Sequence, residues 1–506
     1  MSTNELKSDA APSRTPLMQA APQPPSSMPE IAHLPVEPGL TLASALVDIT
    51  FDDLPDSVVQ CVKLFTMDTL GVIAGAASAP GMTALISALT EWESDGVATL
   101  LLNGRRVNPV SAALANGAAG HSLDFDDQHD PARIHAFCVV LPAVLAAIEA
   151  QSIKQPSHPV TGKQMITALA VGVELFCRLG LACYNSLGKG WHPTTALGTL
   201  AAAAAAARIF ELDAQQTAQA MGVAFVQLSG TTQFIADGAL AKRVGPGFAA
   251  RSGVLAAQLA RHGLTGPLRF LEGKAGLFYL YERGEVKADI LFSNLGGKNS
   301  QDWRLLELSM KPFPCCRCTH TVIQLALDLR AQGLVADDIE RGTIELGKVN
   351  GQIVGARFDR HHANPVVHAQ FNAAYAFAAA LVDGQVTIPS FTAERITAED
   401  VAFASKLDYQ DAIDIEATAV APARVRLMLK DGTEKTVERW RMKGAPNDPM
   451  SDDEVMAKFA SCLEYGFHSN TASIHALRDC IMRLETAADS TTLITAFNAC
   501  RNIGSV

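Results

Sequence analysis

The sequence has no excess of positive charge, since 41 Lys and Arg residues stand against 52 Asp and Glu residues and the formal net charge is −11. A nucleic-acid partner would require a basic face, so this balance argues against one. It also leaves any small anionic substrate to be bound by a few local cations. Those cations should therefore stand out from their surroundings in the sequence.

Disulfide spacing and membrane-spanning runs are also missing. The ten cysteines are scattered and show no small-scaffold spacing, so we expect reduced thiols in an intracellular protein. Every long apolar stretch is interrupted by glycine, polar or charged residues. The longest candidate, 196–207, is too short and too rich in alanine to span a bilayer. We predict a buried helix there and no contact with a membrane.

Residues 1–40 contain eight prolines among Ser, Ala and Gln and no uninterrupted apolar run. They cannot bury enough apolar surface to offset the entropy that is lost on ordering, so a disordered tail is predicted. They also lack the apolar segment of a secretion signal, and Glu5 and Asp9 count against a mitochondrial transit peptide. The cytoplasm is the expected location, with mitochondria as the alternative.

The rest of the chain shows two patterns of predicted secondary structure. Residues 41–300 carry apolar residues at helical spacing without a strand pattern, which predicts the first part of a large all-helical domain. Residues 301–445 mix helices with strands, including a hairpin whose turn is Asp431-Gly432, and predict a smaller α+β lid domain. Residues 446–506 open with a capping box and return to the helical domain. The predicted fold class is therefore mainly α, with the lid inserted before the C-terminal helices.

Individual elements follow from the same periodicities. Helices are predicted at 58–75, 110–120, 139–150, 163–179, 195–209, 214–226, 248–262, 319–331 and 370–382. Strands are predicted at 342–347, 423–430 and 433–441.

The stretch 115–135 holds three histidines and four aspartates behind small residues, and we take it as the centre of the chain. Its small residues, 116–120, allow a backbone to approach a neighbouring element closely. The aspartates would strain an apolar core, so we expect this polar density to face a cleft or water. The alternative is a solvated loop that caps two helices.

Two further segments predict anion binding. His192 follows a Gly-Trp pair at the start of a helix, where N–H groups and the helix dipole favour an anion. Lys242 and Arg243 stand side by side between glycines and before another helix, which suits a clamp for carboxylates. The alternative for this pair is a basic helix entry on the surface.

The cysteine-rich segment near residue 315 raises the question of zinc. Cys315, Cys318 and His320 are potential ligands, but a fourth ligand at suitable spacing is missing, so no metal is predicted. His320 is instead expected to face the cleft as a polar group at a helix start. Tyr375 lies in an otherwise apolar helix and is either a core tyrosine or a phenol aimed at the site.

The chain resembles the MmgE/PrpD family in a series of segments that runs from about residue 41 to residue 490. The matching segments are 116–127, 190–192, Lys242, 311–314 and 369–375. The resemblance implies a large helical domain, a smaller α+β lid, a homodimer, and no metal or organic cofactor. The family includes 2-methylcitrate dehydratases, cis-aconitate decarboxylases and iminodisuccinate epimerases. The spacing around His135 is closest to that of the decarboxylases.

The resemblance also implies roles for individual residues. His135 becomes the proton-transfer residue, and Asp124 would set the tautomer of its imidazole by hydrogen bonding. The implied catalytic residues are His135, Asp124, His192 and Tyr375, and the implied substrate-binding residues are Lys242, Arg243 and His320.

Substrates of the family are small polycarboxylates in which a proton is removed from, or delivered to, a carbon next to a carboxylate. An imidazole titrates in the right range for this step. The implied function is a cofactor-independent lyase that acts on a small di- or tricarboxylic acid, like cis-aconitate decarboxylase or 2-methylcitrate dehydratase. The alternatives are an epimerase or isomerase of a small dicarboxylate, and a non-catalytic helical dimer.

Overall fold

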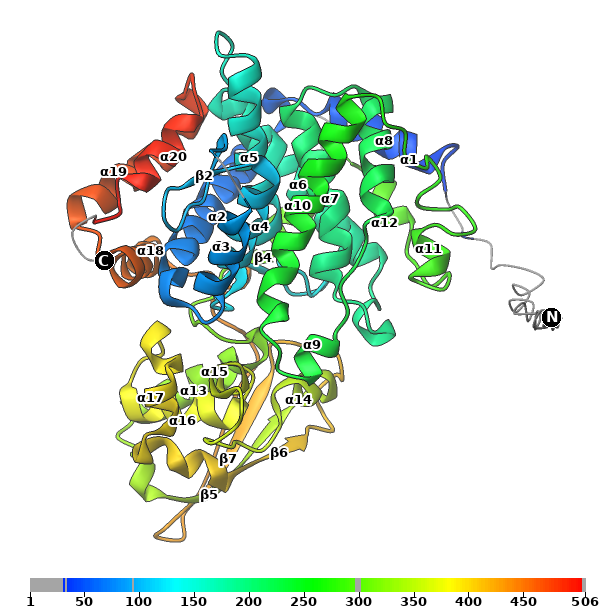
Figure 1. Cartoon of the computed structure of the whole chain (residues 1–506). Helices are drawn as coiled ribbons and strands as arrows, with labels where there is room; N and C mark the ends of the chain where they lie inside the picture. The colour runs from blue at the N-terminus through cyan, green and yellow to red at the C-terminus, as the bar shows by residue number, and fades with distance from the viewer. Residues whose placement is uncertain (1–30, 32–33, 93–94, 296–301, 503–506) are drawn as a thin grey trace, which may run out of the picture.

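The architecture is mainly helical, as predicted, and a large helical body carries a smaller unit that contains a β-sheet (Figure 1). The computed structural model describes residues 31, 34–92, 95–295 and 302–502. Most of the predicted tail, 1–30 and 32–33, lies outside this part of the chain. Residues 38–40 of the predicted tail already belong to the first helix.

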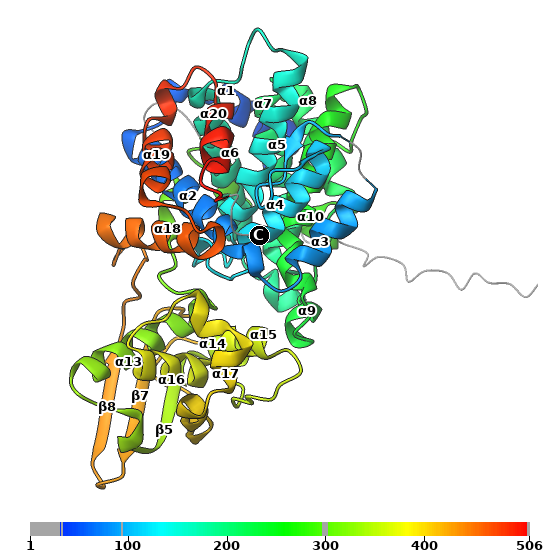
Figure 2. The same ribbon diagram turned by 60° about the vertical axis from the view of Figure 1, so that its left-hand side comes forward.

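The helical body is assembled from two separate parts of the chain. Its first part contains α1 (Pro38–Asp48), α2 (Asp56–Gly75), α3 (Met82–Glu91), α4 (Pro109–His121), α5 (Phe137–Lys154), α6 (Gly162–Ala182), α7 (Pro193–Ile209), α8 (Ala214–Phe225), α9 (Gln233–Ala236), α10 (Ala241–Arg261), α11 (Leu277–Leu280) and α12 (Asp289–Phe292). Its last part contains α18 (Asp452–Phe467), α19 (Thr471–Met482) and α20 (Thr491–Asn498). Because α18 and α19 pack against α2, the C-terminal segment completes the body that the N-terminal part begins (Figure 2).

The helices predicted between residues 58 and 262 are present, although α10 begins at Ala241 and not at 248. The prediction that no strand interrupts this region is wrong. Three strands of two residues lie there, and each is too short to produce an alternating pattern. They are β1 (Ala98–Thr99), which pairs with β2 (Arg106–Val107), and β3 (Gln128–His129), which pairs with β4 (Leu308–Ser309).

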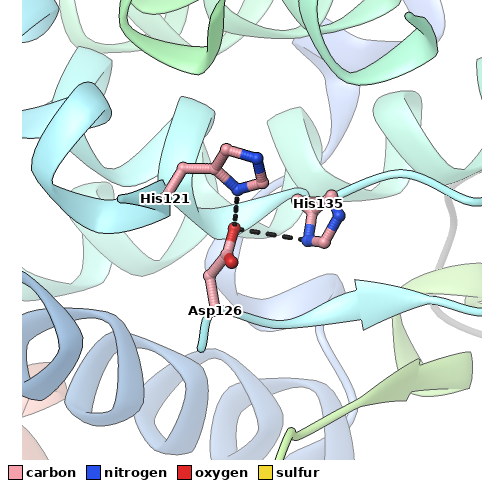
Figure 3. A group of neighbouring side chains, drawn as sticks. All are labelled: His121, Asp126 and His135. Atoms are coloured by element: carbon pink, nitrogen blue, oxygen red, sulfur yellow. Dashed lines mark hydrogen bonds and ion pairs between the residues drawn. The ribbon is translucent and has the colours of Figure 1, made fainter. Parts of the chain in front are cut away.

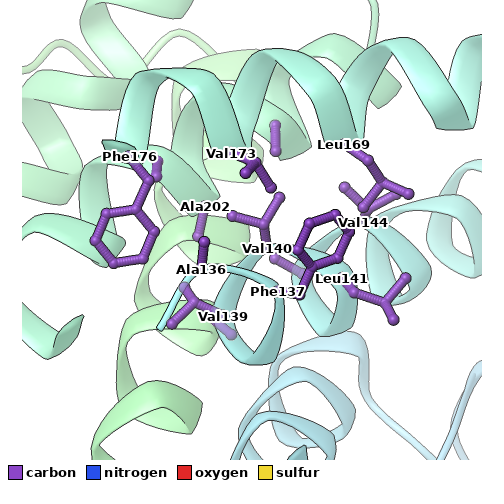
Figure 4. Close-up of a cluster of buried hydrophobic side chains, with 14 of the residues drawn as sticks. Ala136, Phe137, Val139, Val140, Leu141, Val144, Leu169, Val173, Phe176 and Ala202 are labelled. Atoms are coloured by element: carbon purple, nitrogen blue, oxygen red, sulfur yellow. The ribbon is translucent and has the colours of Figure 1, made fainter. Parts of the chain in front are cut away.

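Small residues allow the central helices of the body to approach one another closely. The alanine run 201–207 of α7 is fully buried. Gly117 of α4 faces Gly247 of α10, and a Cβ on Gly247 would lie 2.1 Å from the carbonyl oxygen of Leu114. Beside them, α5 packs apolar side chains such as Phe137 against α6 and α7 (Figure 4). The backbones of α4 and α10 therefore meet without intervening side chains.

Three helices of the body, α2, α5 and α6, are long and apolar enough to cross a membrane by length and composition alone. The prediction that 196–207 is the longest apolar candidate is therefore wrong, because single glycine and polar residues interrupt these helices without removing their apolar character. Between 78% and 94% of the apolar window in each helix is buried inside the protein.

The smaller unit contains a four-stranded sheet in the order β6-β5-β7-β8, in which β5 and β6 are parallel and the other neighbours antiparallel. Strands β7 and β8 form the predicted hairpin, and Gly432 in its turn has a φ of 85°, which glycine adopts without strain. Helices α13 and α16 pack beside the sheet (Figure 2). The elements are α13 (His320–Ala331), β5 (Ile339–Leu346), α14 (Lys348–Val354), α15 (Pro365–Gln370), α16 (Ala373–Asp383), α17 (Ala393–Thr397), β6 (Leu407–Asp411), β7 (Ala423–Leu429) and β8 (Glu434–Arg439).

Each unit has its own apolar core. One core combines residues of α1 to α10 with residues of α18 to α20, and the other lies between Cys315 and Leu427. The domain boundaries at 300/301 and 445/446 remain a prediction. Gln370 of the smaller unit donates to the carbonyl oxygen of Leu123 at 2.8 Å, which places the central stretch of the sequence at the junction of the two units.

We expect Gly247→Ala to destabilise the protein although alanine is the better helix former. The gain in helix propensity is about 1 kcal/mol, whereas a methyl group so close to a backbone oxygen forces α4 and α10 apart at a cost of about 3 kcal/mol. Urea unfolding should therefore show a lower midpoint. Phe248→Ala, at the neighbouring position that is 39% exposed, is the control and should unfold close to wild type. Equal stability of Gly247→Ala and wild type would contradict the close packing of these helices.

Candidate active site

The candidate site is built on the loop that joins α4 to α5. Its aspartates are buried, since Asp124, Asp126 and Asp127 are 4%, 0% and 0% exposed. The expectation that these side chains face a cleft or water is therefore wrong for Asp126 and Asp127, whereas Asp124 lines a small pocket. Burial of three carboxylates is possible here because each one contacts cations, imidazoles or backbone N–H groups.

Asp126 holds two histidines together (Figure 3). Its Oδ2 lies 2.8 Å from Nδ1 of His121 and 3.3 Å from Nδ1 of His135. The Nδ1 of His135 also lies 2.8 Å from the carbonyl oxygen of Asp127. Because both partners of this nitrogen are acceptors, Nδ1 of His135 carries the proton and Nε2 is left as the proton acceptor.

The second nitrogen of His121 contacts a lysine. Lys242 Nζ lies 2.9 Å from Nε2 of His121, and an ammonium group only donates, so His121 accepts at Nε2 and donates from Nδ1 to Asp126. Burial lowers the pKa of His121 to about 4, and Lys242 adds to this effect while Asp126 opposes it. His121 is therefore neutral near pH 7, with both ring nitrogens engaged.

Two lysines compensate the charge of Asp124. Lys311 Nζ donates to the carbonyl oxygen of Asp124 at 2.8 Å and to its Oδ1 at 3.0 Å, and Lys242 Nζ lies 3.5 Å from the same Oδ1. Burial alone would raise the pKa of Asp124, but the two lysines hold it well below its usual value. The prediction that Asp124 sets the tautomer of His135 is wrong, because the carboxylate that reaches this imidazole belongs to Asp126.

Asp127 connects the loop to the start of α5. Its carboxylate accepts hydrogen bonds from the N–H groups of Ala136 at 2.8 Å and Phe137 at 2.9 Å. Burial, followed by the neighbouring charge of Asp126, raises the pKa of Asp127 to about 7, against the effect of these N–H groups. The residue thus caps α5, while its carbonyl oxygen fixes the ring of His135.

Lys242 and Arg243 lie in the first turn of α10, and their side chains make different contacts. Arg243 donates to the carbonyl oxygen of Pro80 at 3.0 Å and to Oε1 of Gln370 at 3.3 Å. Both cations nevertheless line one small pocket at the junction of the two units. Its lining residues are His121, Ser122, Asp124, Ala239, Lys242, Arg243, Val367, Gln370 and Phe371.

His135 and His192 lie next to His121. The ring centroids of His135 and His192 are 4.7 Å and 6.4 Å from that of His121. Nδ1 of His192 lies 2.9 Å from Oγ1 of Thr195, and burial, followed by Lys242, holds the pKa of His192 well below its usual value. The structure therefore brings together His135, His192 and Lys242, although the pocket is lined by His121 and by neither of the other two histidines among the described residues.

The remaining two predicted residues lie elsewhere. His320 is fully buried against Phe313, and its Nε2 contacts the carbonyl oxygen of Cys315 at 3.2 Å. Tyr375 is fully buried in the core of the smaller unit, and its hydroxyl donates to the carbonyl oxygen of Ser390. Neither is in contact with the histidine cluster, which corrects the expectation that both reach the site. For Tyr375 the alternative of a core tyrosine describes the structure.

Three residues of the site were not selected from the sequence: His121, Asp126 and Lys311. The first two stand in the central stretch, but their contact depends on the local path of the loop, in which Asp124 has a φ of 53°. Lys311 belongs to one of the segments that carry the family resemblance, and this resemblance was the one feature of the sequence that could have indicated a role for it in the site. Its contact with Asp124 joins positions 187 residues apart, which local spacing does not reveal.

Three residues of the site are potential metal ligands. One nitrogen each of His121 and His135 and an oxygen of Asp126 lie within 4.8 Å of one another. No other such group occurs in the described residues, so Cys315, Cys318 and His320 do not form one. At the histidine cluster, Oδ2 of Asp126 already contacts Nδ1 of both histidines. Lys242 is bonded to His121, and Lys311 Nζ lies 4.0 Å from Asp126. Two ammonium groups so close would repel a cation.

The fold and the site are those of a mainly helical protein in which an imidazole, a carboxylate and two cations line a pocket between a helical body and an α+β unit. Residues 40–288 match the MmgE/PrpD N-terminal domain and residues 313–482 match the MmgE/PrpD C-terminal domain. The chain belongs to the MmgE/PrpD family.

Its curated relatives include enzymes named cis-aconitate decarboxylase. The one from Aspergillus terreus is 26% identical over 474 residues, which cover 89% of this chain and 94% of that protein. The one from Homo sapiens is 28% identical over 470 residues, covering 90% and 93%, and the one from Mus musculus is 30% identical over 370 residues, covering 70% and 72%. Together with the family, these relatives identify the chain as a lyase of the decarboxylase or dehydratase type.

We expect activity to survive removal of metal, because the ligand atoms of the histidine cluster are satisfied by one another and lie next to two lysines. Dialysis against a strong chelator should leave turnover and the thermal midpoint unchanged. Loss of activity that stoichiometric zinc or magnesium restores would contradict this expectation.

The low pKa of His121 predicts a specific pH dependence of stability. Between about pH 4 and pH 6.5 the unfolded chain binds a proton at this residue and the folded chain does not, so stability is lost as the pH falls through this range. The free energy of unfolding of wild type minus that of His121→Asn should therefore fall by about 2 kcal/mol between pH 7.5 and pH 5. Urea titrations at both pH values measure it. A difference that does not change with pH would mean that His121 titrates alike in both states.

Proposed function

We propose that this lyase decarboxylates a small unsaturated tricarboxylate of the cis-aconitate type and needs no metal or organic cofactor. The substrate class is supported by relatives of that name that cover about nine-tenths of the chain. The observation that carries the chemistry is the cluster of His121, Asp126 and His135 beside Lys242, which joins a proton carrier to a fixed cation.

Loss of carbon dioxide from such a substrate consumes one proton. The bond to the departing carboxylate breaks, and its electron pair forms a new double bond. The electron pair of the old double bond moves to the carbon next to a remaining carboxylate, where a proton adds. The tricarboxylate and one proton thus give a dicarboxylate and carbon dioxide. An imidazole is suited to deliver that proton near neutral pH.

His135 is the proposed proton-transfer residue. Both ring nitrogens of His121 are engaged, whereas within the described part of the chain the hydrogen bonds of the His135 ring involve Nδ1, which leaves its Nε2 available to exchange a proton. Asp126 and the carbonyl oxygen of Asp127 both contact Nδ1 of His135 and fix the orientation of its ring. His192 is proposed as a second residue that contacts the substrate, and Asp124 acts through the lysines that it holds.

Lys242 and Arg243 are proposed to bind the carboxylates of the substrate. Arg243 donates to two neutral oxygens, and a carboxylate would be the stronger acceptor for it. The smaller unit contributes Val367, Gln370 and Phe371 to the pocket, so a displacement of this unit would open it. This is the proposed lid function, which would exclude water during the reaction. A homodimer in the cytoplasm remains a prediction.

The proposal is tested with a panel of cis-aconitate, citrate, 2-methylcitrate and a small chiral dicarboxylate, followed by proton NMR in heavy water. We expect loss of carbon dioxide from cis-aconitate with one deuterium in the product. Turnover of 2-methylcitrate with loss of water would identify a dehydratase instead, and exchange without net loss would identify an epimerase.

His135→Gln should affect the chemical step far more than folding. Glutamine keeps much of the volume and the hydrogen-bonding capacity but cannot transfer a proton near pH 7, so turnover should fall by roughly 10²–10⁴-fold with a small change in the thermal midpoint. His129→Gln is the matched control, because His129 lies buried in the same loop and its Nε2 contacts Glu307 at 3.2 Å, away from Asp126. Normal turnover of His135→Gln, or a larger loss in His129→Gln, would refute the assignment.

A further inference from the structure

The main chain of the Asp-rich loop is held by side chains from distant parts of the sequence. The carbonyl oxygens of Leu123, Asp124, Phe125 and Asp127 each accept a hydrogen bond from a side chain. In the same order, the donors are Gln370 at 2.8 Å, Lys311 at 2.8 Å, Lys458 at 2.9 Å and His135 at 2.8 Å. These donors lie in the smaller unit, in the segment that leads into it, in the C-terminal helix α18 and at the end of the loop itself. The shape of the loop is therefore set by the whole fold.

Among these donors, Lys458 contacts both the main chain and the side chain of the same loop residue, Phe125. Its Nζ donates to the carbonyl oxygen of Phe125, lies 4.1 Å from the centre of the Phe125 ring, and forms an ion pair of 2.5 Å with Asp68 of α2. Lys458 and Asp68 are 6% and 2% exposed. A buried ammonium group is costly unless it is paired and hydrogen-bonded, and here the pairing fixes Lys458 against the loop.

The position of this contact in the loop gives it a consequence for the site. Phe125 stands between Asp124, which contacts the two lysines, and Asp126, which contacts the two histidines. Asp124 has a φ of 53°, a left-handed conformation that is strained for a residue other than glycine. Without Lys458 the carbonyl group of Phe125 would lose its side-chain partner, and the peptide between Phe125 and Asp126 would be free to relax. Asp126 would then move relative to His121 and His135.

We propose that Lys458 is a positioning residue for the reaction, because it fixes the peptide that carries Asp126 to its two histidines. Lys458 is not among the described residues that line the small pocket and instead lines a separate groove together with Phe125. Its influence on the substrate therefore passes through the loop. The kinetic part of this inference rests on the proposed function, whereas the effect on the hydrogen bonds of the loop does not.

The experiment compares Lys458→Met with Lys63→Met. Lys63 is a matched control, since it is 1% exposed and its Nζ donates to the carbonyl oxygen of Met482 at 3.0 Å and to Glu485 at 2.7 Å. It joins α2 to the C-terminal helices as Lys458 does, but without touching the loop. With cis-aconitate as the probe, we expect kcat of Lys458→Met to fall about 10–100-fold with KM within about twofold. Lys63→Met should keep the wild-type kcat, and equal kcat in the two variants would overturn the proposal.

A second substitution separates a loss of protein stability from a displacement of the Asp-rich loop. Lys458→Met leaves Asp68 buried without its cation, so the combination of Lys458→Met with Asp68→Asn should recover part of the thermal midpoint. It should not recover kcat, because Phe125 still lacks its partner. Recovery of kcat along with the thermal midpoint would mean that Lys458 serves only the stability of the helical body.

A signal that does not depend on turnover completes the test. The proton on Nδ1 of His121, bonded to Asp126, should give a downfield proton NMR resonance in wild type and in Lys63→Met, and it should shift or disappear in Lys458→Met. An unchanged resonance in Lys458→Met overturns the positioning. If wild type does not turn over cis-aconitate, the proposed function fails while this resonance still decides the role of Lys458.

Discussion

Compensation of buried charge is the constraint on which the site depends. Carboxylates taken out of water cost several kcal/mol each, and removing one partner of a buried pair costs about 3–5 kcal/mol. That is a large part of the net stability of a protein, which is about 5–15 kcal/mol. Asp124 and Asp126 are tolerated because Lys311 and Lys242 lie within 3 to 4 Å of one or the other. The loop therefore cannot form its observed shape unless these lysines are in place.

This constraint makes the site a product of the complete fold. The cations and donors that hold the loop come from α10, from the segment between the two units, from the smaller unit and from α18. The C-terminal helix thus contributes to the site although its contacts lie behind the loop and outside the pocket. The close packing of α4 on α10, made possible by Gly117 and Gly247, brings Lys242 to His121. Packing of apolar helices and pairing of charges support each other here.

The sequence predicts those features of the structure that depend on the local periodicity of apolar residues or on a local concentration of histidines and aspartates. The long central helices between residues 58 and 262 and the hairpin around Asp431-Gly432 are predictable because their patterns repeat over many residues, whereas the four-residue helices and the two-residue strands carry no pattern. The stretch 115–135 was recognised by its histidines and aspartates. The side-chain contacts within this stretch were not predicted. They depend on the path of the loop, in which Asp124 is left-handed and Asp126 is the carboxylate that reaches His135. Tyr375 was ambiguous for a similar reason, since a buried phenol in an apolar helix looks the same at a site and in a core.

The charge balance of the pocket also bears on how the proton for the proposed reaction is supplied. Two lysines are opposed by the ionised carboxylates of Asp124 and Asp126 and by Asp127, whose pKa is about 7. His121, with a pKa of about 4, adds no charge near pH 7. Arg243 contributes one further cation, and its present acceptors are neutral. A substrate with three carboxylates would bring more negative charge than Arg243 can offset. In a buried pocket such an excess favours the uptake of a proton.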